Sequence, residues 1–503
     1  MRNRALAGAR RAALVVLAIA AVLGGAAAWP TADEAYAAAA TLDTATPLAE
    51  STESVAALDA AAQSVRVGGL TFKAWNFDAR VPPIGERPFD HSTPGDFKGD
   101  AENVSMYWIN GVPYDFPLRQ ASTGYHALSS YLLTGEKRYL LHAEAQAKHL
   151  IAIRVVQGKA WFYPARFPYL LNRTRPELLV PPWYQGLAQG IAVGFFARLY
   201  EVTGDAKYKN AAEHTLESFL TPKRTGKLWV SAVDSNGYLC IEEYPSSNWH
   251  FVLNGHMQAA LGLWDYYRVT GDQRALKLYR GALTAIVRYG EAFRTPGWVS
   301  AYSLGARALF VHYHVGVMNR FSQLYRLTAD RRLVHLWNEF DDDYPAPEKW
   351  GTMRLNRGSH NAVRFTSTGA VAQRTVIKTS TGRTFRIDRR TKIAGQSGIW
   401  LRIDRGSLKG YYVREVPSQS YVRGAINALT YNPSVRATLV PGAWVAKRFD
   451  AAGALVDSRK LNAAAPTSVR AAKRATVNGR RMVMLATGDL EGYWLPERAI
   501  KLP

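Results

Sequence analysis

Cysteine is almost absent from this chain of 503 residues, which contains only Cys240. A single cysteine excludes an intramolecular disulfide framework and a zinc site built from several cysteines. We expect this thiol to be packed and inert. Acidic residues are also scarce, since 40 Asp and Glu stand against 63 Lys and Arg. Hydrophobic residues make up 48% of the chain, which excludes a wholly disordered protein.

The excess of positive charge is concentrated near the C-terminus. Residues 351–503 contain 27 Lys and Arg but only 8 Asp and Glu. Such a local excess attracts polyanions, so we predict an anionic polysaccharide substrate and a wall polymer bound by this basic region. The N-terminal pattern described below predicts export from the cell, so we predict no nucleic-acid partner. The alternative explanation of this charge is that it serves only to keep the protein soluble.

The N-terminus has the pattern of a targeting segment. Arginines precede an apolar run over residues 12–28, and Ala35–Ala37 offer a small-residue cleavage site. This pattern predicts a signal peptide over residues 1–37, with a retained anchor as the alternative. The Ala, Ser and Thr of residues 38–66 predict a linker. We therefore expect a secreted protein that associates with the cell wall.

A Tyr-x-x-Thr pattern followed by a turn recurs four times. The copies begin at Tyr131, Tyr200, Tyr267 and Tyr325, and their Thr residues are 69, 67 and 58 residues apart. Tyr and Thr three residues apart share one helix face. In three copies Gly follows Thr and is suited to end a helix, and in all four an acidic residue comes next and is suited to begin another.

These turns predict a series of helical hairpins. We predict a mainly α fold over residues 67–348, an (α/α) toroid or barrel with an irregular N-terminal segment. A linear solenoid is the alternative. Long and dissimilar loops between the hairpins favour the toroid, because a closed ring gathers such loops at one mouth, where sites usually form.

After residue 348 the pattern changes to alternating apolar and polar residues. Residues 363–365, 384–387 and 400–403 predict strands. The segment 406–415 recurs 82 residues later as 488–497, with Gly-Tyr and a further aromatic residue in both copies. This pattern resembles bacterial SH3-like modules, which commonly bind wall polymers. We predict an all-β, SH3-like repeat region over residues 349–503.

Three uncommon motifs stand before or at predicted helix starts. They are PPWYQGLAQG at 181–190, EEYP at 242–245 and FVLNG at 251–255. Their order and spacing resemble the C-terminal catalytic region of the D-glucuronyl C5-epimerases, which act on the uronic acids of heparosan-type polysaccharides. The resemblance covers roughly residues 105–345 and leaves the basic region outside.

The resemblance implies an isomerase that converts D-glucuronate to L-iduronate within a polymer. Inversion at C5 removes a proton α to a carboxylate and returns a proton to the other face. Two proton-handling groups and stabilisation of the enediolate are required. No redox cofactor is needed, so we expect none. By resemblance, the catalytic residues are Glu243, Tyr244, Tyr302 and Tyr313.

Other polar and aromatic residues are predicted to bind the substrate. A buried amide within an apolar helix needs a partner, and Asn before a helix can serve as its N-cap or bind a ligand. The epimerases carry an Arg three residues after the loop Tyr, where this chain has Gly305, so Arg307 is the substitute expected to hold the uronate carboxylate. The predicted substrate-binding residues are Trp183, Gln189, Asn254, Arg307 and His314.

Alternatives remain open at the level of the sequence. A polyuronide lyase would form the same C5 carbanion, and a non-catalytic wall or polysaccharide-binding protein would use only the basic region. A hydrolase needs two carboxylates that flank one bond, whereas the adjacent Glu242 and Glu243 would point to opposite sides of extended backbone. His312 and His314 have no carboxylate at a supporting spacing, so we predict no metal. A homodimer also remains open.

Overall fold

The computed structural model describes residues 62–171 and 176–503. The predicted signal peptide over 1–37 and most of the predicted linker over 38–66 lie outside the described residues. The predicted end of the linker at residue 66 is wrong. Gln63–Val67 form strand β1, which pairs antiparallel with β2 (Leu70–Ala74). The alternating side chains of β2 bury Leu70 and Phe72 on one face, which stabilises this hairpin.

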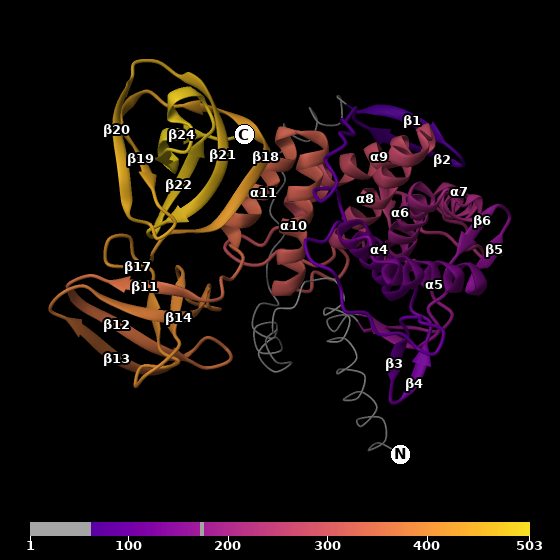
Figure 1. Ribbon diagram of the computed structural model, residues 1–503, viewed down its shortest axis with the longest axis horizontal. Coiled ribbons are helices and arrows are strands. Elements are labelled where there is room, and N and C mark those ends of the chain that lie inside the picture. The colour runs from indigo at the N-terminus through magenta and orange to yellow at the C-terminus, as the bar shows by residue number, and fades with distance from the viewer. Residues whose placement is uncertain (1–61, 172–175) are drawn as a thin grey trace. The chain divides into compact units, whose positions relative to one another are not determined.

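The described chain divides into two compact units (Figure 1). Of the described residues, the helical unit contains 62–171, 176–293 and Ala301–Thr328, and the β-rich unit contains Arg294–Ser300 and Ala329–Pro503. None of the helices in the described ranges combines the length and the apolar character that crossing a bilayer requires.

Among the described residues, the helical unit contains three helical hairpins, in each of which the first helix packs against the second, and one further helix. The helices are α4 (Pro117–Thr134), α5 (Lys137–Ile153), α6 (Gly186–Thr203), α7 (Ala206–Leu220), α8 (Leu253–Thr270), α9 (Gln273–Tyr289) and α10 (Val311–Thr328). Short strand pairs occupy the segments between them: β3 (Tyr107–Ile109) with β4 (Val112–Tyr114), β5 (Val155–Gln157) with β6 (Ala160–Phe162), β7 (Tyr169–Leu171) with β8 (Glu177–Leu179), and β9 (Ser231–Val233) with β10 (Leu239–Ile241).

The first helices of the hairpins form an inner row. Helix α6 packs against both α4 and α8, and α8 also contacts α10 (Figure 1). Every residue of α6 from Gly186 to Leu199 is buried, as is every residue of α8 from Leu253 to Tyr266. Helices α5, α7 and α9 each pack on their hairpin partner. The predicted fold of paired helices is therefore confirmed, while closure of the row into a ring stays a prediction.

The repeated Tyr-x-x-Thr turns form as the sequence predicts. Gly135, Gly204 and Gly271 adopt φ values of 72°, 70° and 72°, and each donates its backbone N–H to the carbonyl of the Tyr at the start of its copy. This left-handed conformation is accessible to Gly at little cost, which explains its place in the pattern. In the fourth copy Ala329 takes the same conformation with φ 53°.

The acidic residues after these turns begin the second helix of each hairpin. Asp205, Asp272 and Asp330 accept backbone N–H groups two residues later, which satisfies donors that a helix N-terminus leaves free. Glu136 precedes α5 but makes no side-chain cap hydrogen bond. The predicted helix start is thus confirmed at all four positions and the side-chain cap at three.

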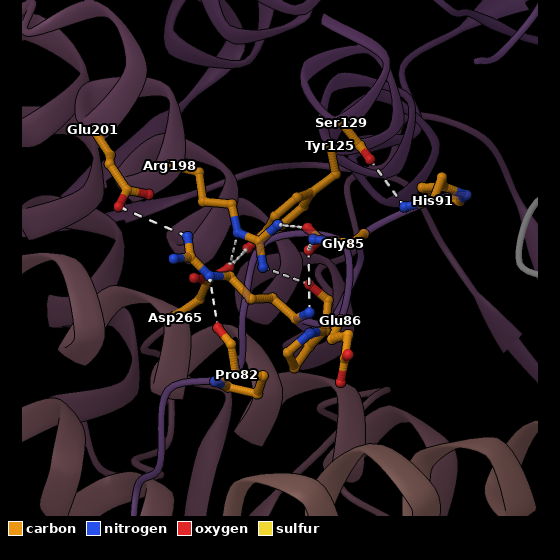
Figure 2. Close-up of polar contacts among 12 residues, drawn as sticks. Pro82, Gly85, Glu86, His91, Tyr125, Ser129, Arg198, Glu201 and Asp265 are labelled. Atoms are coloured by element: carbon orange, nitrogen blue, oxygen red, sulfur yellow. Dashed lines mark hydrogen bonds and ion pairs between the residues drawn. The ribbon is translucent and has the colours of Figure 1, made fainter. Parts of the chain in front are cut away.

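A buried ion network joins the inner helices to the segment before α4. Arg198 of α6 is 3% exposed, and its guanidinium pairs with Asp265 of α8 and with Asp90. The Tyr125 hydroxyl of α4 donates to Asp265 Oδ2 at 2.8 Å. Figure 2 shows Arg198, Asp265 and Tyr125 converging. Because these charges lie between helices that are otherwise apolar, the network fixes how α4, α6 and α8 align.

The β-rich unit contains two seven-stranded sheets. The first has the order β13-β12-β16-β15-β14-β11-β17, and the second has the order β20-β19-β23-β22-β21-β18-β24. The first sheet consists of β11 (Gly351–Leu355), β12 (Gly358–Phe365), β13 (Val371–Thr379), β14 (Arg383–Thr391), β15 (Trp400–Ile403), β16 (Tyr412–Arg414) and β17 (Ser420–Val422). The second consists of β18 (Ala425–Leu439), β19 (Gly442–Phe449), β20 (Leu455–Ala463), β21 (Thr467–Val477), β22 (Arg480–Leu485), β23 (Trp494–Pro496) and β24 (Ile500–Lys501).

The two sheets are copies of one arrangement, since each strand of the second sheet occupies the place of the strand seven earlier. Cation–π contacts are repeated as well, with Arg364 over Tyr411 in the first copy and Arg448 over Tyr493 in the second. The predicted strands and the 82-residue repeat are therefore confirmed. The SH3-like assignment stays a prediction.

Helix α11 (Arg331–Asp343) belongs to the β-rich unit, so the observed division differs from the boundary predicted after residue 348. Arg474 of β21 forms ion pairs with Asp341 and Asp342 at the end of α11. Asn338 of α11 accepts a hydrogen bond of 2.7 Å from the Tyr431 hydroxyl. Helical periodicity places α11 among helices, whereas these contacts attach it to the second sheet.

Candidate active site

The EEYP motif directly follows β10 in the interior of the helical unit. Glu242 is completely buried, and its carboxylate accepts the backbone N–H of Phe251 at 3.1 Å. Glu243 and Tyr244 are 3% and 2% exposed. Since adjacent residues of extended backbone point to opposite sides, Glu242 holds the following loop while Glu243 is directed toward other groups.

Glu243, Tyr244 and Tyr302 form one hydrogen-bonded cluster. The Tyr302 hydroxyl lies 3.2 Å from Glu243 Oε1 and 3.2 Å from the Tyr244 hydroxyl. The single phenolic proton of Tyr302 can serve one of these oxygens at a time. The cluster therefore offers a short path along which a proton can move between a carboxylate and two phenols.

Two further tyrosines complete this cluster. The Tyr313 ring, on the first turn of α10, lies 4.3 Å from the Tyr302 ring between centroids. Tyr169 of β7 stacks on Tyr244 at 6.1 Å between centroids. The four predicted catalytic residues are thus brought together. Tyr169 was missed, because nothing in the sequence around it separates it from the other tyrosines.

Burial controls the protonation of the cluster. It raises the pKa of Glu243 to about 7, against the opposing hydrogen bonds from Tyr244 and Tyr302. Burial, reinforced by the charge of Glu243, raises the pKa of Tyr244 and Tyr302 well above the usual value. The pKa of Tyr313 is raised in the same way. Near neutral pH the cluster therefore holds one carboxyl group ready to gain or lose a proton and three phenols that keep theirs.

The first turn of α8 makes room for the Glu243 carboxylate. A side chain at Gly255 would place its Cβ 2.2 Å from Glu243 Oε2, so only glycine permits this approach. Oε2 itself is buried and has no hydrogen-bond partner among the described residues. The partial positive charge of a helix N-terminus favours the ionised form of a carboxylate placed there. The Gly of FVLNG is thus explained by its contact with EEYP.

The loop that carries Tyr302 is attached to the start of α8. The Leu253 N–H donates to the Tyr302 carbonyl at 3.3 Å, and the Gly305 N–H donates to the His250 carbonyl at 3.1 Å. A Cβ at position 305 would lie 2.2 Å from the Trp249 carbonyl oxygen. A side chain at position 305 would therefore require the backbone at Trp249 to move.

Arg307 lies on the same loop as Tyr302 and next to Ala308, whose carbonyl accepts the Tyr302 N–H at 2.7 Å. Arg307 has φ 49°, and its Nη1 donates to the Ala292 carbonyl at 2.6 Å. This bond uses the guanidinium to hold the segment near Phe293. The predicted role of Arg307 as carboxylate ligand stays a prediction.

Two other predicted binding residues have structural roles. The Gln189 amide is fully used inside the unit: Oε1 accepts from the Tyr163 N–H, and Nε2 donates to the Trp161 carbonyl and the Ser218 hydroxyl. Its prediction as a ligand is wrong, since these partners satisfy the buried amide. Trp183 donates its indole N–H to the Phe167 carbonyl at 2.7 Å and lies 6.1 Å from Tyr244 between ring centroids. Its ring lies beside the cluster, and its role in substrate binding stays a prediction.

Asn254 and His314 lie on the two helices that flank the cluster. The N-cap of α8 is Val252, so the alternative role of Asn254 as N-cap is wrong. Asn254 Oδ1 is buried and has no hydrogen-bond partner in the described part of the chain, which leaves it available to a ligand. His314 is 1% exposed and follows Tyr313 on α10.

Arg320 is a further candidate that the sequence prediction missed. It stands seven residues after Tyr313 on α10, so the two residues share a helix face, about 10 Å apart along the axis. Arg320 Nη1 donates to the Gly316 carbonyl of the same helix, and Nε has no partner among the described residues. Within those residues no carboxylate forms an ion pair with it, and burial lowers its pKa to about 10. A half-buried cation without a counter-ion among the described residues is suited to an anionic ligand.

Other polar groups do not form a metal centre. Within residues 62–171 and 176–503, no three His, Cys, Asp or Glu side chains gather as metal ligands do. Glu177 pairs with His250 at 3.0 Å, and the His250 ring lies 6.5 Å from that of Tyr244. Cys240 is buried, and burial raises the pKa of its thiol, as expected for a packed cysteine.

The geometry defines a helical-hairpin unit whose interior carries a cluster suited to proton transfer. Residues 156–341 match the family model of the D-glucuronyl C5-epimerase C-terminus. This match confirms the resemblance predicted from PPWYQGLAQG, EEYP and FVLNG. The matched segment contains Glu243, Tyr244, Tyr302 and Tyr313.

Two relatives show how far the similarity extends. Over 206 residues the chain is 28% identical to an uncharacterized protein of Methanocaldococcus jannaschii, which covers 40% of this chain and 61% of that protein. Over 90 residues it is 31% identical to the D-glucuronyl C5-epimerase of Caenorhabditis elegans, which covers 18% of this chain and 14% of that enzyme. The chain thus spans less than two thirds of each relative.

Solved structures share only a distant likeness. The cellobiose 2-epimerase from Bacillus thermoamylovorans is 17% identical with a TM-score of 0.35, covering 46% of this chain and 59% of that chain. The unsaturated glucuronyl hydrolase from Streptococcus agalactiae is 14% identical with a TM-score of 0.31, covering 44% and 56%. At these TM-scores the likeness carries no argument about the reaction.

Proposed function

We propose that this protein inverts C5 of glucuronate residues in a polysaccharide. The observation that carries the proposal is the buried contact of Glu243 with Tyr302, which also joins Tyr244 and packs against Tyr313. The family match over residues 156–341 supports the same reaction class. A carboxyl group with a pKa of about 7 is suited to accept a proton at neutral pH and to release it again.

In the proposed mechanism Tyr302 and Glu243 act on one face of the sugar. The Tyr302 oxygen takes the C5 proton while its own phenolic proton moves to Glu243 Oε1, which lies 3.2 Å away. The electron pair of the C–H bond moves into the substrate carboxylate and forms an enediolate. Tyr313 then donates its phenolic proton to the opposite face of C5. Exchange of protons with solvent returns Glu243 and Tyr313 to their starting states.

The substrate carboxylate gains negative charge in this step, so a fixed cation is required nearby. We propose that Arg320 supplies it, because Arg320 shares the face of α10 with Tyr313 and has no counter-ion among the described residues. Asn254 Oδ1, which also lacks a partner in that part of the chain, can accept a hydrogen bond from a sugar hydroxyl. The substrate would therefore meet donors and acceptors from both α8 and α10.

Replacing Arg320 with Gln should lower kcat/KM for a glucuronate polymer by roughly tenfold to a hundredfold, mainly through kcat, because a charge-assisted hydrogen bond that strengthens as the enediolate forms is lost. Arg326→Gln on the same helix is the matched control, since Arg326 instead donates to the Glu86 carbonyl. Steady-state kinetics measure both constants. Equal kcat/KM values for the two variants would contradict this role.

The reaction itself is tested with the purified chain in heavy water. A heparosan-type glucuronate polymer should acquire deuterium at C5 and new iduronate signals in its NMR spectrum. Other glucuronate polymers tested in parallel would define the substrate. If none of these polymers acquires deuterium at C5, the proposal is contradicted.

A polyuronide lyase is the second candidate, because the same carbanion could expel the oxygen at C4. It would give an unsaturated uronate with strong ultraviolet absorption in place of iduronate. A two-carboxylate hydrolase is disfavoured, since Glu242 is committed to the Phe251 N–H and is directed away from the Glu243 cluster.

A further inference from the structure

The β-rich unit contains a cleft between its two sheets. The cleft has a volume of about 530 Å³, and strands β19 and β22 supply much of its wall. Tyr421 from the first copy and Phe449 from the second provide aromatic surface. A second cavity of about 370 Å³ shares Tyr421 with the first and adds Arg354 and Arg423.

Cations dominate the wall of the main cleft. Lys447, Arg480, Arg481 and Arg498 line it, and its lining residues include no carboxylate. Arg481 is neutralised by ion pairs with Asp341, Asp342 and Glu497. For the other three, no ion pair occurs within the described residues. Arg480 donates only to the Ser418 hydroxyl, at 2.7 Å, so its charge is not compensated.

Because the two sheets are copies, each cation of the cleft can be compared with the residue at the equivalent position of the first sheet. Val363 pairs with Tyr412 in the first sheet, and Lys447 pairs with Trp494 at the same place in the second. Val363 is only 3% exposed and belongs to an apolar cluster. At the 82-residue offset of the repeat, Arg480 corresponds to Gly398 and Arg498 to Val416.

All three uncompensated cations of the cleft therefore replace uncharged residues of the first copy. The architecture does not need them, since the first copy forms the same sheet without them. Charges that the fold does not require, gathered on one concave wall beside aromatic rings, indicate a ligand.

We propose that this cleft binds the carboxylate groups of a uronate-containing polysaccharide and so retains the polymer on the enzyme. Lysine and arginine bind carboxylates, and the faces of Tyr421 and Phe449 offer apolar surface to a sugar ring. The identity of the polymer rests on the proposed function, whereas the anionic character of the ligand rests on the cleft alone.

The test compares binding of a heparosan-type glucuronate polymer to three forms of the full chain. One form is unaltered, and one carries Lys447→Gln, Arg480→Gln and Arg498→Gln. The control carries Arg374→Gln, Lys378→Gln and Lys460→Gln, which remove the same charge from exposed strand positions that do not line the cleft. Calorimetric titration in about 0.1 M salt keeps long-range attraction partly screened.

We expect the cleft variant to lose roughly tenfold to a hundredfold in affinity and the control to lose less than about threefold. C5 exchange on a short oligosaccharide should be equal in all three forms. Equal affinity of the cleft variant and the control would overturn the proposal. A polyphosphate chain that binds the unaltered cleft more tightly than the uronate polymer would overturn it as well.

Failure of the proposed function is distinguishable from failure of this site. If no polymer exchanges at C5 but the cleft variant still loses affinity selectively, the binding site stands and the epimerase does not. If exchange occurs and affinity is unchanged, the epimerase stands and the binding site does not.

Discussion

Glu243→Gln should lower the rate of C5 exchange by roughly 10²–10⁴-fold, the range that a positioned general base contributes. Gln keeps the size of the side chain and can still contact the Tyr302 hydroxyl, but it cannot take up a proton. The variant therefore removes the chemistry while it preserves the 3.2 Å contact on which the cluster depends. Heavy-water exchange followed by NMR measures this loss.

The same variant should be more stable than the unaltered protein at pH 8. Burial raises the pKa of Glu243 from 4.5 in the unfolded chain to about 7, so ionising it in the folded state costs about 3 kcal/mol above pH 7. That penalty is absent below pH 4.5 and grows as the pH rises toward 7. Gln carries no such penalty, so the gain in stability should vanish in acid.

Calorimetry of both proteins at pH 4.5 and pH 8 checks the sign of this effect. Glu213→Gln on the exposed side of α7 is the control, since its carboxylate forms only a 3.9 Å pair with Lys209. It should change neither exchange nor the pH dependence of stability. An inactive Glu243→Gln that is also unstable at pH 8 would indicate a structural role for Glu243.

The titration of Glu243 also determines how kcat/KM should depend on pH. In the unaltered protein, kcat/KM should rise through about pH 7, because the carboxyl group must be ionised to accept a proton. The pKa of each phenol in the cluster is raised well above its usual value, so the tyrosines should cause no fall at moderately alkaline pH. A profile that is flat between pH 5 and pH 9 would contradict the assignment of Glu243.

Arg198→Met should destabilise the helical unit by about 3–5 kcal/mol, the usual cost of breaking a buried ion pair by removing one partner. Asp265 is completely buried and Asp90 is nearly so, and both lose the guanidinium that compensates them. Asp265 retains Arg268 at 3.0 Å, so the uncompensated charge falls mainly on Asp90. Chemical denaturation followed by circular dichroism at the helical wavelength measures the loss.

A second variant separates the charge from the packing. In Arg198→Met with Asp90→Asn, the uncompensated carboxylate is gone, so part of the lost stability should return. Arg274→Met is the control, since this exposed residue pairs with Asp272 and Glu217 at the surface. A loss in Arg198→Met no larger than that in the control would show that the network of Figure 2 contributes little.

Local patterns predicted the helical hairpins well, because their information lies within a few residues. In three of the turns the Gly N–H bonds directly to the carbonyl of the Tyr four residues earlier, as the bond from Gly204 to Tyr200 shows. The place of α11 could not be predicted in this way. It depends on Arg474, which follows Asp342 by 132 residues.

The candidate site was also predicted well by local motifs and poorly where the answer depends on distant residues. EEYP and FVLNG located Glu243 and Tyr244 by resemblance, and the structure then joined them to Tyr302 and Tyr313. Gln189 failed because a buried amide predicts only that a partner exists, and its partners proved to be internal. Arg320 was missed for the opposite reason, since an arginine within a helix signals nothing until its surroundings prove to lack a carboxylate.

The order of strands in the β-rich unit has a kinetic consequence. In the helical unit each hairpin joins neighbours along the chain, so few residues must be ordered before a contact forms. In each β sheet the first strand pairs with the last, as β11 does with β17 and β18 with β24. Such closure orders a long loop before it gains a contact, which slows folding. Each sheet can therefore complete its pairing only after its last strand has joined its first.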